Sequence, residues 1–480
     1  MIPAAERRNP LRWYLAALLL AILLTLSEGY PLLKFQSQRL AELLPALGLL
    51  LWCFRRQPRS FFEAPAISGW YGLGLLGLAA VALVGGAVGP VPWISLGFLG
   101  LALLQFGLLP LLQPAWRQHR ADTARLLALF AVVLVGMDVG LSLVARLYGL
   151  PVHTWVNRLT PEGGVFSLPY LHLNARWANQ MAVLLLWTFL PLLQQLQSGT
   201  IRRWRGFWWP ICGAVPLVCL LQIGLSQGDG AALASVLGTV MVGWQAWRSG
   251  GERRRLYGTG LLLLLGAALG ATVLTLALSG GSFFSEALQR NSAELLEGGS
   301  EPSMRLSNWL VYGRALLASP LWGVGIQAVP AGAGLCGPHN LPLALLYWLG
   351  ILGTGCALLL ATGFVPKRWS GFRHNAMAAP LLVALFAYQL VDDIWLRPLA
   401  LALLLVLLPS LLPDGALDGW PVPSRLSPVL ARFALPPARY RLIALIGVLL
   451  ILVSAVVPGG VGFQPSPAVA TPGSTCLLFF

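Results

Sequence analysis

Charged side chains are scarce in this chain of 480 residues, where Asp, Glu, Lys and Arg make up only 10% of the sequence. An ordinary soluble protein contains about 25%, so this scarcity excludes that class. Hydrophobic residues make up 57% and lie in long runs without the alternation of half-buried strands. A helix of about 20 apolar residues crosses a bilayer and pairs its own backbone polar groups. The sequence therefore predicts an all-α fold, a polytopic bundle of about 12 to 13 transmembrane helices.

Motifs for metals and nucleotides are lacking as well. The six cysteines form no Cys-x-x-Cys pair and mostly fall inside apolar runs, so their pattern does not imply a disulfide framework or a zinc site. No Asp-x-Asp pair is present of the kind with which metal-dependent sugar transferases hold a nucleotide diphosphate. A Gly-x-Gly-x-x-Gly pattern at 332–337 follows no strand, so it does not indicate a dinucleotide site. We therefore expect no metal and no cofactor.

Positive charge is abundant, and its distribution indicates membrane topology rather than nucleic-acid binding. The formal net charge is +15, but nearly all of it lies in short loops between apolar runs. Cytoplasmic loops of membrane proteins are enriched in Lys and Arg. With the N-terminus inside, 23 of the 32 basic residues fall on the inner side, and the alternation holds along the whole chain. We therefore predict a cytoplasmic N-terminus and no nucleic-acid partner.

The organisation follows from the apolar runs, beginning with an N-terminal run that lacks an obvious signal-peptidase site and is expected to stay as the first helix. The candidate spans cover residues 11–27, 40–54, 68–88, 91–113, 126–146, 177–196, 208–225, 231–247, 259–278, 341–364, 377–395, 396–412 and 441–458. This divides the chain into nine helices within 1–278, a large outer loop at 279–340, three helices within 341–412, a Pro-rich cytoplasmic linker at 413–440, the last helix, and a flexible outer tail at 459–480.

Two outer loops, roughly 147–176 and 279–340, are longer than most other connections. Long loops in compact folds are usually functional or disordered. In the second loop, apolar residues recur at helical spacing between Met304 and Leu317. We therefore expect an amphipathic helix there, lying along the outer membrane surface and ending near Pro320.

His339 and Asn340 stand at the outer mouth of the span that opens at Leu341. An imidazole in this place can take a proton from an incoming hydroxyl or, when charged, stabilise a phosphate. The simpler alternative is a loop histidine that caps the helix together with Asn340. Both interpretations stay open.

Three arginines, Arg176, Arg305 and Arg314, lie on the outer side, where the positive-inside rule makes arginine scarce. The planar guanidinium fork suits the oxygens of a diphosphate. A contact with a lipid headgroup explains any single one of them just as well. Their number beside the long loops favours a shared site, although Arg305 and Arg314 are about two and a half helical turns apart and need not share a face.

Polar residues also open the sixth span, where Asn174, Arg176, Asn179 and Gln180 precede the apolar run. Such side chains at a helix mouth are costly unless they face protein or a wet cavity. A site role and a role at the membrane interface are equally compatible with them.

Acidic residues are few within the apolar runs. Asp138 lies inside the fifth span, which makes it a functional-site hypothesis by default, but no partner is evident except Arg146, and we leave it unassigned. Near the outer end of the eleventh span, Asp392, Asp393 and Arg397 most simply pair with one another or with the outer loop.

Several of these stretches together resemble one family. They are Arg305-x-x-x-Trp309, then Pro320-Leu-Trp-Gly323-Val-Gly325, Pro338-His339-Asn340 with Gly350-x-x-Gly353, Asn174-x-Arg176-x-x-Asn179-Gln180 before Leu190-Pro191-Leu192, and Asp392 to Pro398. The pattern resembles the O-antigen ligase and Wzy-like O-antigen polymerase superfamily, the WaaL-like membrane glycosyltransferases. Hydropathy agrees over most of the chain, whereas the specific motifs cover a minor part of it.

The resemblance implies an enzyme of the bacterial inner membrane with its site on the periplasmic side. Such enzymes move a glycan from an undecaprenyl-diphosphate carrier to an acceptor hydroxyl, which belongs to the lipid A core in ligases, to the growing glycan in polymerases and to a protein in related transferases. It implies that Arg305 binds the diphosphate and His339 acts on the acceptor or the leaving phosphate. The expected substrate-binding residues are Arg176, Arg314, Asn174, Asn179, Gln180 and Asn340. Transfer is expected to be metal-independent and inverting, with membrane lipid as a further partner.

One stretch departs from the family. Many members carry an arginine in a Ser-Arg-Gly-like turn, where Ser226-Gln227-Gly228-Asp229-Gly230 stands here. Arg176 could supply the missing contact, or the activity could be altered or absent. Two other functions therefore stay open, a membrane transporter, since some relatives are linked to inorganic carbon uptake, and a non-catalytic scaffold of envelope-polysaccharide assembly.

Overall fold

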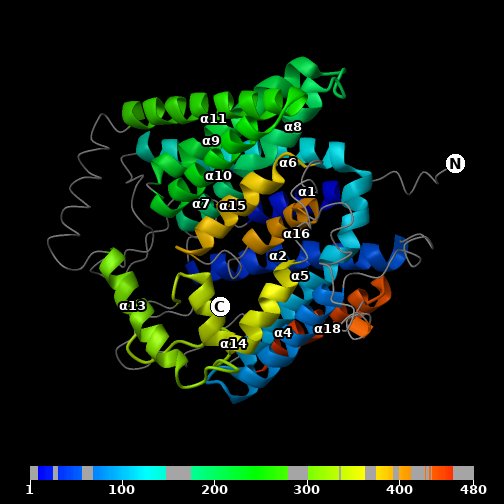
Figure 1. Ribbon diagram of the computed structural model, residues 1–480, viewed down its shortest axis with the longest axis vertical. Helices are drawn as coiled ribbons and strands as arrows, with labels where there is room; N and C mark the ends of the chain where they lie inside the picture. The colour runs from blue at the N-terminus through cyan, green and yellow to red at the C-terminus, as the bar shows by residue number, and fades with distance from the viewer. Residues whose placement is uncertain are drawn as a thin grey trace.

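The structure is a computed structural model (Figure 1) that describes residues 9–24, 31–56, 69–147, 175–226, 228–278, 301–333, 337–362, 375–392, 399–411, 428, 432–433 and 435–457. Every regular secondary-structure element in these ranges is a helix. The elements are α1 (Pro10–Leu24), α2 (Pro31–Arg56), α4 (Gly69–Val88), α5 (Pro92–Gln118), α6 (Arg120–Leu147), α7 (Ala175–Leu185), the 3-10 helix η2 (Leu186–Thr188), α8 (Phe189–Gln197), α9 (Arg205–Leu225), α10 (Asp229–Arg248), α11 (Gly251–Leu278), α13 (Glu301–Leu316), α14 (Leu341–Thr362), α15 (Ala378–Gln389), α16 (Ala400–Leu411) and α18 (Pro437–Val456).

Each predicted span overlaps helical structure, and the all-α polytopic bundle is confirmed. Among the described residues, seven helices are long and apolar enough to cross a bilayer, and α1, part of α2, α15 and α16 are shorter apolar helices. The span predicted at 177–196 is not one regular α-helix, because η2 interrupts it. The split predicted between 377–395 and 396–412 is confirmed by the end of α15 and the start of α16.

Some predictions fall outside the described residues. They concern the tail at 459–480, most of the linker at 413–440, nearly all of the loop at 147–176 and the first part of the loop at 279–340. The last helix begins at Pro437, earlier than the predicted 441.

Small residues set the closest helix packing in the bundle. A Cβ added to Gly100 of α5 would lie 2.6 Å from the carbonyl oxygen of Gly447 in α18, and a Cβ on Gly107 would lie 3.0 Å from that of Tyr440. Without a hydrophobic driving force between helices in lipid, such close van der Waals contact is what holds spans together. The α5–α18 pair therefore depends on having no side chain at these positions.

A break inside α14 fixes the segment that follows α13. Gly350 has φ 64° and ψ −171°, which is not helical. The segment 319–325 lies alongside the break and pairs with it, since Val324 N donates to Tyr347 O at 3.1 Å and Ile351 N donates to Pro320 O at 2.8 Å. A Cβ on Gly323 would lie 2.3 Å from the backbone of Trp348. Gly323 and Gly350 therefore allow the segment after α13 to pack directly against the backbone of α14.

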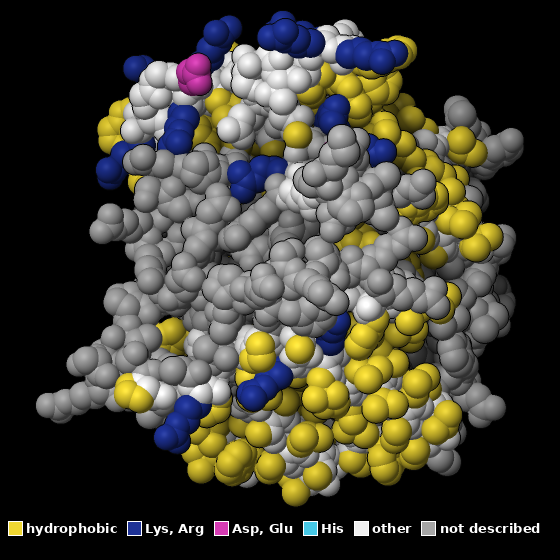
Figure 2. Space-filling model, turned by 90° about the vertical axis from the view of Figure 1, so that its right-hand side faces the viewer, with side chains coloured by type: hydrophobic (Ala, Val, Ile, Leu, Met, Phe, Trp, Pro, Cys, Tyr) yellow, Lys and Arg dark blue, Asp and Glu magenta, His cyan; other side chains and the backbone are white. Residues whose placement is uncertain are grey.

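Basic side chains gather on one end of the bundle. Figure 2 shows the right-hand side of Figure 1, where Lys and Arg are scattered over the surface and few acidic side chains are present. Exposed arginines stand where α8 is followed by α9 and α10 by α11, either in the connecting turn or in the first turn of the helix that follows, namely Arg202, Arg203, Arg205, Arg253, Arg254 and Arg255. These turns belong to the loops that the sequence predicts to be cytoplasmic.

Candidate functional site

Helix α13 turns a polar and aromatic face toward the rest of the molecule. Arg305 Nη1 donates to the carbonyl of Val391 at 3.1 Å, Asn308 Nδ2 to that of Gly337 at 2.9 Å, and Trp309 Nε1 to that of Pro338 at 2.6 Å. Asn308 and Trp309 follow Arg305 by three and four positions and therefore lie on the same side of the helix as Arg305. The predicted helix is confirmed as α13, whereas its position along the outer membrane surface stays a prediction. Its side-chain hydrogen bonds hold the backbone segment that leads into His339.

The opposite face of α13 carries the apolar residues. Leu306 is 57% exposed and Leu310 is 55% exposed. Arg314 is also exposed, and no hydrogen bond or ion pair joins it to a described residue. The sequence left open whether Arg305 and Arg314 share a face of the helix. In the structure no contact joins Arg314 to the side chains around His339, and its predicted role in substrate binding stays a prediction.

His339 and Asn340 form the turn that starts α14. Asn340 Oδ1 accepts a hydrogen bond from Leu343 N at 3.0 Å, so the predicted helix cap is confirmed. Its amide also reaches α15, because Nδ2 donates to Leu390 O at 3.0 Å. His339 has φ 48°, a left-handed conformation that is uncommon outside glycine. A non-glycine residue in that conformation is found where the surroundings over-determine it, frequently at functional sites.

The end of α15 provides the carboxylate on which these segments meet. Asp392 Oδ1 lies 3.1 Å from His339 Nδ1, and Asp392 Oδ2 accepts a hydrogen bond from Gln180 Nε2 at 3.2 Å. The side chains of His339 and Asp392 are only 10% and 7% exposed. Arg305 binds the preceding residue through Val391 O. We call Arg305, His339, Asn340, Asp392 and Gln180 the Asp392 cluster.

Helix α7 adds a second polar contact beside Gln180. Asn179 Oδ1 accepts a hydrogen bond from Ser226 Oγ at 2.6 Å, and both side chains are buried. A Cβ on Gly228 would lie 2.3 Å from Asn179 Nδ2. Ser226 and Gly228, which belong to the turn that departs from the family pattern in the sequence, therefore pack against Asn179, the residue before Gln180. Gln227 lies outside the described residues.

The structure brings together five of the predicted residues and leaves others apart. Arg305, His339, Asn340 and Gln180 belong to the Asp392 cluster, and Asn179 is its neighbour through α7. Asn174 and the side chain of Arg176 lie outside the described residues. The buried polar end of α7 therefore faces protein, as the cost of leaving it in lipid requires.

Asp392 is the functional candidate that sequence reasoning did not include in the site. The pattern did indicate that Asp392 pairs with a neighbour or with the outer loop, and its contact with His339 confirms the second alternative. The signal that could have found it is a carboxylate close to the outer end of an apolar helix, where an unpaired charge is costly. Asp393 and Arg397 lie outside the described residues.

The cluster pairs an imidazole, that of His339, with the carboxylate of Asp392, which is an arrangement suited to a general base. A carboxylate that accepts a hydrogen bond from Nδ1–H fixes the tautomer of the imidazole and leaves Nε2 as a proton acceptor. Burial makes the pair sensitive to the loss of either partner, because an unpaired charge of low exposure is poorly solvated. In the described part of the chain, no group of three His, Cys, Asp or Glu residues has the arrangement of a metal site.

The comparisons with known proteins do not add to this geometry. No protein-family model matches the sequence, and a search of curated proteins finds no match.

Proposed function

We propose that the protein is a membrane glycosyltransferase of the O-antigen ligase type, which moves a glycan from an undecaprenyl-diphosphate carrier to an acceptor hydroxyl. One observation carries the proposal: a buried histidine–aspartate pair and an arginine come together from three segments that are far apart in sequence. The proposal also draws on the resemblance of the motifs around Arg305 and His339.

The chemistry requires a base and a way to balance the charge of a diphosphate. His339 Nε2 accepts the proton of the acceptor hydroxyl while the hydroxyl oxygen attacks the anomeric carbon. The bond from that carbon to the diphosphate oxygen breaks, and the polyprenyl diphosphate leaves with the electron pair. Asp392 stabilises the imidazolium that forms. A single displacement of this kind inverts the anomeric configuration.

Arg305 is the residue that we assign to the diphosphate. A guanidinium has five N–H donors, and one of those of Arg305 goes to Val391 O. That contact aims the head group toward the end of α15, beside Asp392. Fixed positive charge next to a water-poor site stabilises negative charge on a leaving group more strongly than it does in water.

A matched pair of arginines on one helix tests the proposal. Cells that lack the protein are complemented with the unchanged chain, with Arg305→Ala, or with Arg314→Ala, and their lipopolysaccharide and exopolysaccharide are compared on gels. We expect Arg305→Ala to fail and Arg314→Ala to complement, with equal protein in the membrane. Loss of capped lipid A core indicates a ligase, and short single-repeat chains indicate a polymerase. An unchanged profile in cells without the protein would contradict both.

A transporter is the second candidate, and one observation favours it. Asp138 is completely buried within α6, and intramembrane carboxylates mark ion and proton paths in many transporters. The test is solute flux into vesicles that contain the protein. Flux that persists in His339→Ala and disappears in Asp138→Asn would favour a transporter over a transferase. A scaffold has no such observation in its favour.

A further inference from the structure

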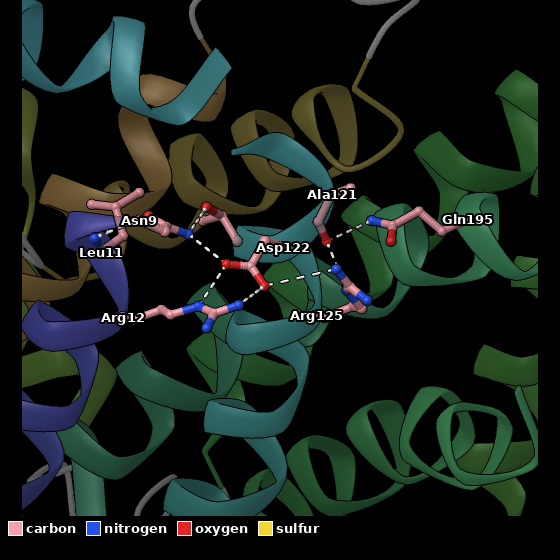
Figure 3. A network of polar contacts seen from close by, with 8 residues as sticks. Asn9, Leu11, Arg12, Ala121, Asp122, Arg125 and Gln195 are labelled. Atoms are coloured by element: carbon pink, nitrogen blue, oxygen red, sulfur yellow. Dashed lines mark hydrogen bonds and ion pairs between the residues drawn. The ribbon is translucent and has the colours of Figure 1, made fainter. Parts of the chain in front are cut away.

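A second cluster of charged residues lies where α1 meets the start of α6 (Figure 3). Arg12 donates to Asp122 through both Nε, at 2.8 Å to Oδ2, and Nη2, at 2.6 Å to Oδ1. Asn9 Nδ2 donates to Asp122 Oδ2 at 3.0 Å, and Arg125 Nη2 lies 3.7 Å from Oδ1. We call Asn9, Arg12, Asp122 and Arg125 the Asp122 cluster. Two guanidinium groups thus share one carboxylate, so the cluster has an excess of positive charge.

This cluster borders an open pocket of about 600 Å³, which is lined by the four residues of the cluster and by Trp13, Ala16 and His119. The side chain of Arg12 is 59% exposed. Its Nη1 group makes no hydrogen bond with a described residue, so it remains available to an acceptor in the pocket. Burial lowers the pKa of His119 below its usual value. This shift favours the neutral imidazole, which can donate an N–H without adding charge.

An apolar stripe leads away from the pocket along α1. Trp13 is 70% exposed, Leu20 58% and Leu24 70%, and Ala16 is exposed between them. These residues lie three or four positions apart and therefore form one face of the helix. Trp13 and Leu24 are 11 positions apart, about 16 Å along a helix, which is about half of a hydrocarbon core of 30 Å. The stripe thus has the depth of one leaflet.

From this combination we infer that the pocket binds an anionic phospholipid, with the phosphate against Arg12, Arg125 and His119 and an acyl chain along the exposed face of α1. Guanidinium groups bind phosphate oxygens as paired donors, and the excess of positive charge favours a headgroup of net negative charge over a zwitterionic one. The adjoining stripe selects a lipid over a free phosphate ion. The turns with basic side chains predict that this end of the bundle is cytoplasmic, where anionic headgroups attract arginine. This inference does not depend on the proposed transferase.

Native mass spectrometry of the purified full-length protein in detergent tests the inference. The protein is titrated with phosphatidylglycerol, with phosphatidylcholine of the same acyl chains, and with inorganic phosphate. We expect phosphatidylglycerol to bind more tightly than phosphatidylcholine. Arg125→Gln should weaken phosphatidylglycerol binding about fivefold, as one lost arginine contact predicts. Ala16→Phe should weaken it as well, because the larger side chain fills the pocket while leaving every charged group in place.

Arg203→Gln is the matched control, since it removes an exposed arginine from the same end of the bundle but outside the pocket. We expect it to leave the preference for phosphatidylglycerol unchanged. Equal effects of Arg203→Gln and Arg125→Gln would mean general attraction to a basic surface and would overturn the inference. It would also be overturned if inorganic phosphate alone competed with the lipid, or if Ala16→Phe had no effect. Should Arg125→Gln fail to fold, the Ala16→Phe result decides.

Discussion

The two charged clusters of this protein use the same chemistry in different surroundings. In the Asp392 cluster the carboxylate contacts His339 and Gln180. The side chains of the ionisable pair, His339 and Asp392, are 10% and 7% exposed. In the Asp122 cluster a carboxylate binds Arg12, whose side chain is 59% exposed. Both join segments that are more than 50 positions apart in the sequence. The two clusters therefore differ in how far solvent reaches their charged side chains.

This difference predicts unequal consequences for function and stability. An exposed ion pair exchanges its partner for water at small cost, with a typical value of about 0 to 1 kcal/mol. A buried pair has no such replacement, and breaking it leaves a poorly solvated group. The Asp392 cluster is therefore expected to be rigid and specific, and the Asp122 cluster adaptable enough to accept a ligand.

The largest effect is expected from Asp392→Asn. The substitution removes the charge that orients and stabilises His339, so glycan transfer should fall by about 100-fold or more. Transfer by purified protein, measured against pH, gives the test. Asp392→Glu keeps the charge and should restore part of the rate at the original pH optimum. A fully active Asp392→Asn enzyme would reduce the pair to a structural contact.

The next largest effect is expected at the contact between α14 and the segment that follows α13. Gly350→Ala should lower the free energy of unfolding by about 1 to 3 kcal/mol, because the residue has positive φ and its added Cβ would lie 2.3 Å from the carbonyl oxygen of Leu321. Gly355→Ala is the control on the same helix, since a Cβ there meets nothing within 4 Å. Thermal unfolding in detergent should separate the two. Equal midpoints would show that the break in α14 is not required.

The smallest effect is expected from Asp122→Asn. With Arg12 largely exposed, the change should cost about 1 kcal/mol or less, and high salt should reduce the difference from the unchanged chain. Chemical denaturation at low and high ionic strength measures this. If Asp122→Asn lowered the free energy of unfolding by several kcal/mol at every salt concentration, the Asp122 cluster would behave like a buried ion pair. The proposed difference between the two clusters would then be wrong.

Much of the fold could be predicted because apolar length and arginine placement are local signals. The span at 341–364 follows from an uninterrupted apolar run, and α14 occupies nearly all of it. The helix over Met304 to Leu317 follows from its periodicity. The break at Gly350 could not be predicted, because it depends on backbone hydrogen bonds with another part of the chain, in which Pro320 O accepts from Ile351 N and Val324 N donates to Tyr347 O.

The site could be predicted only in part. His339, Asn340 and Gln180 stand out because polar residues at helix mouths are costly. The sequence indicated that Asp392 pairs with a neighbour or with the outer loop. That its partner is His339, 53 positions away, could not be predicted, because one sequence does not show which residues meet over such a distance. Arg314 shows the converse, since charge and location suggested a site role while helical geometry turns it away from Arg305.

The most direct measurement is transfer by the purified protein in vesicles supplied with a polyprenyl-diphosphate-linked glycan and a hydroxyl acceptor. The account predicts release of polyprenyl diphosphate, a product of inverted anomeric configuration, and a rate that falls by about 10² to 10⁴ in His339→Ala while the variant stays folded. A folded His339→Ala protein that transfers the glycan at the unchanged rate, or a product that retains its configuration, would contradict it.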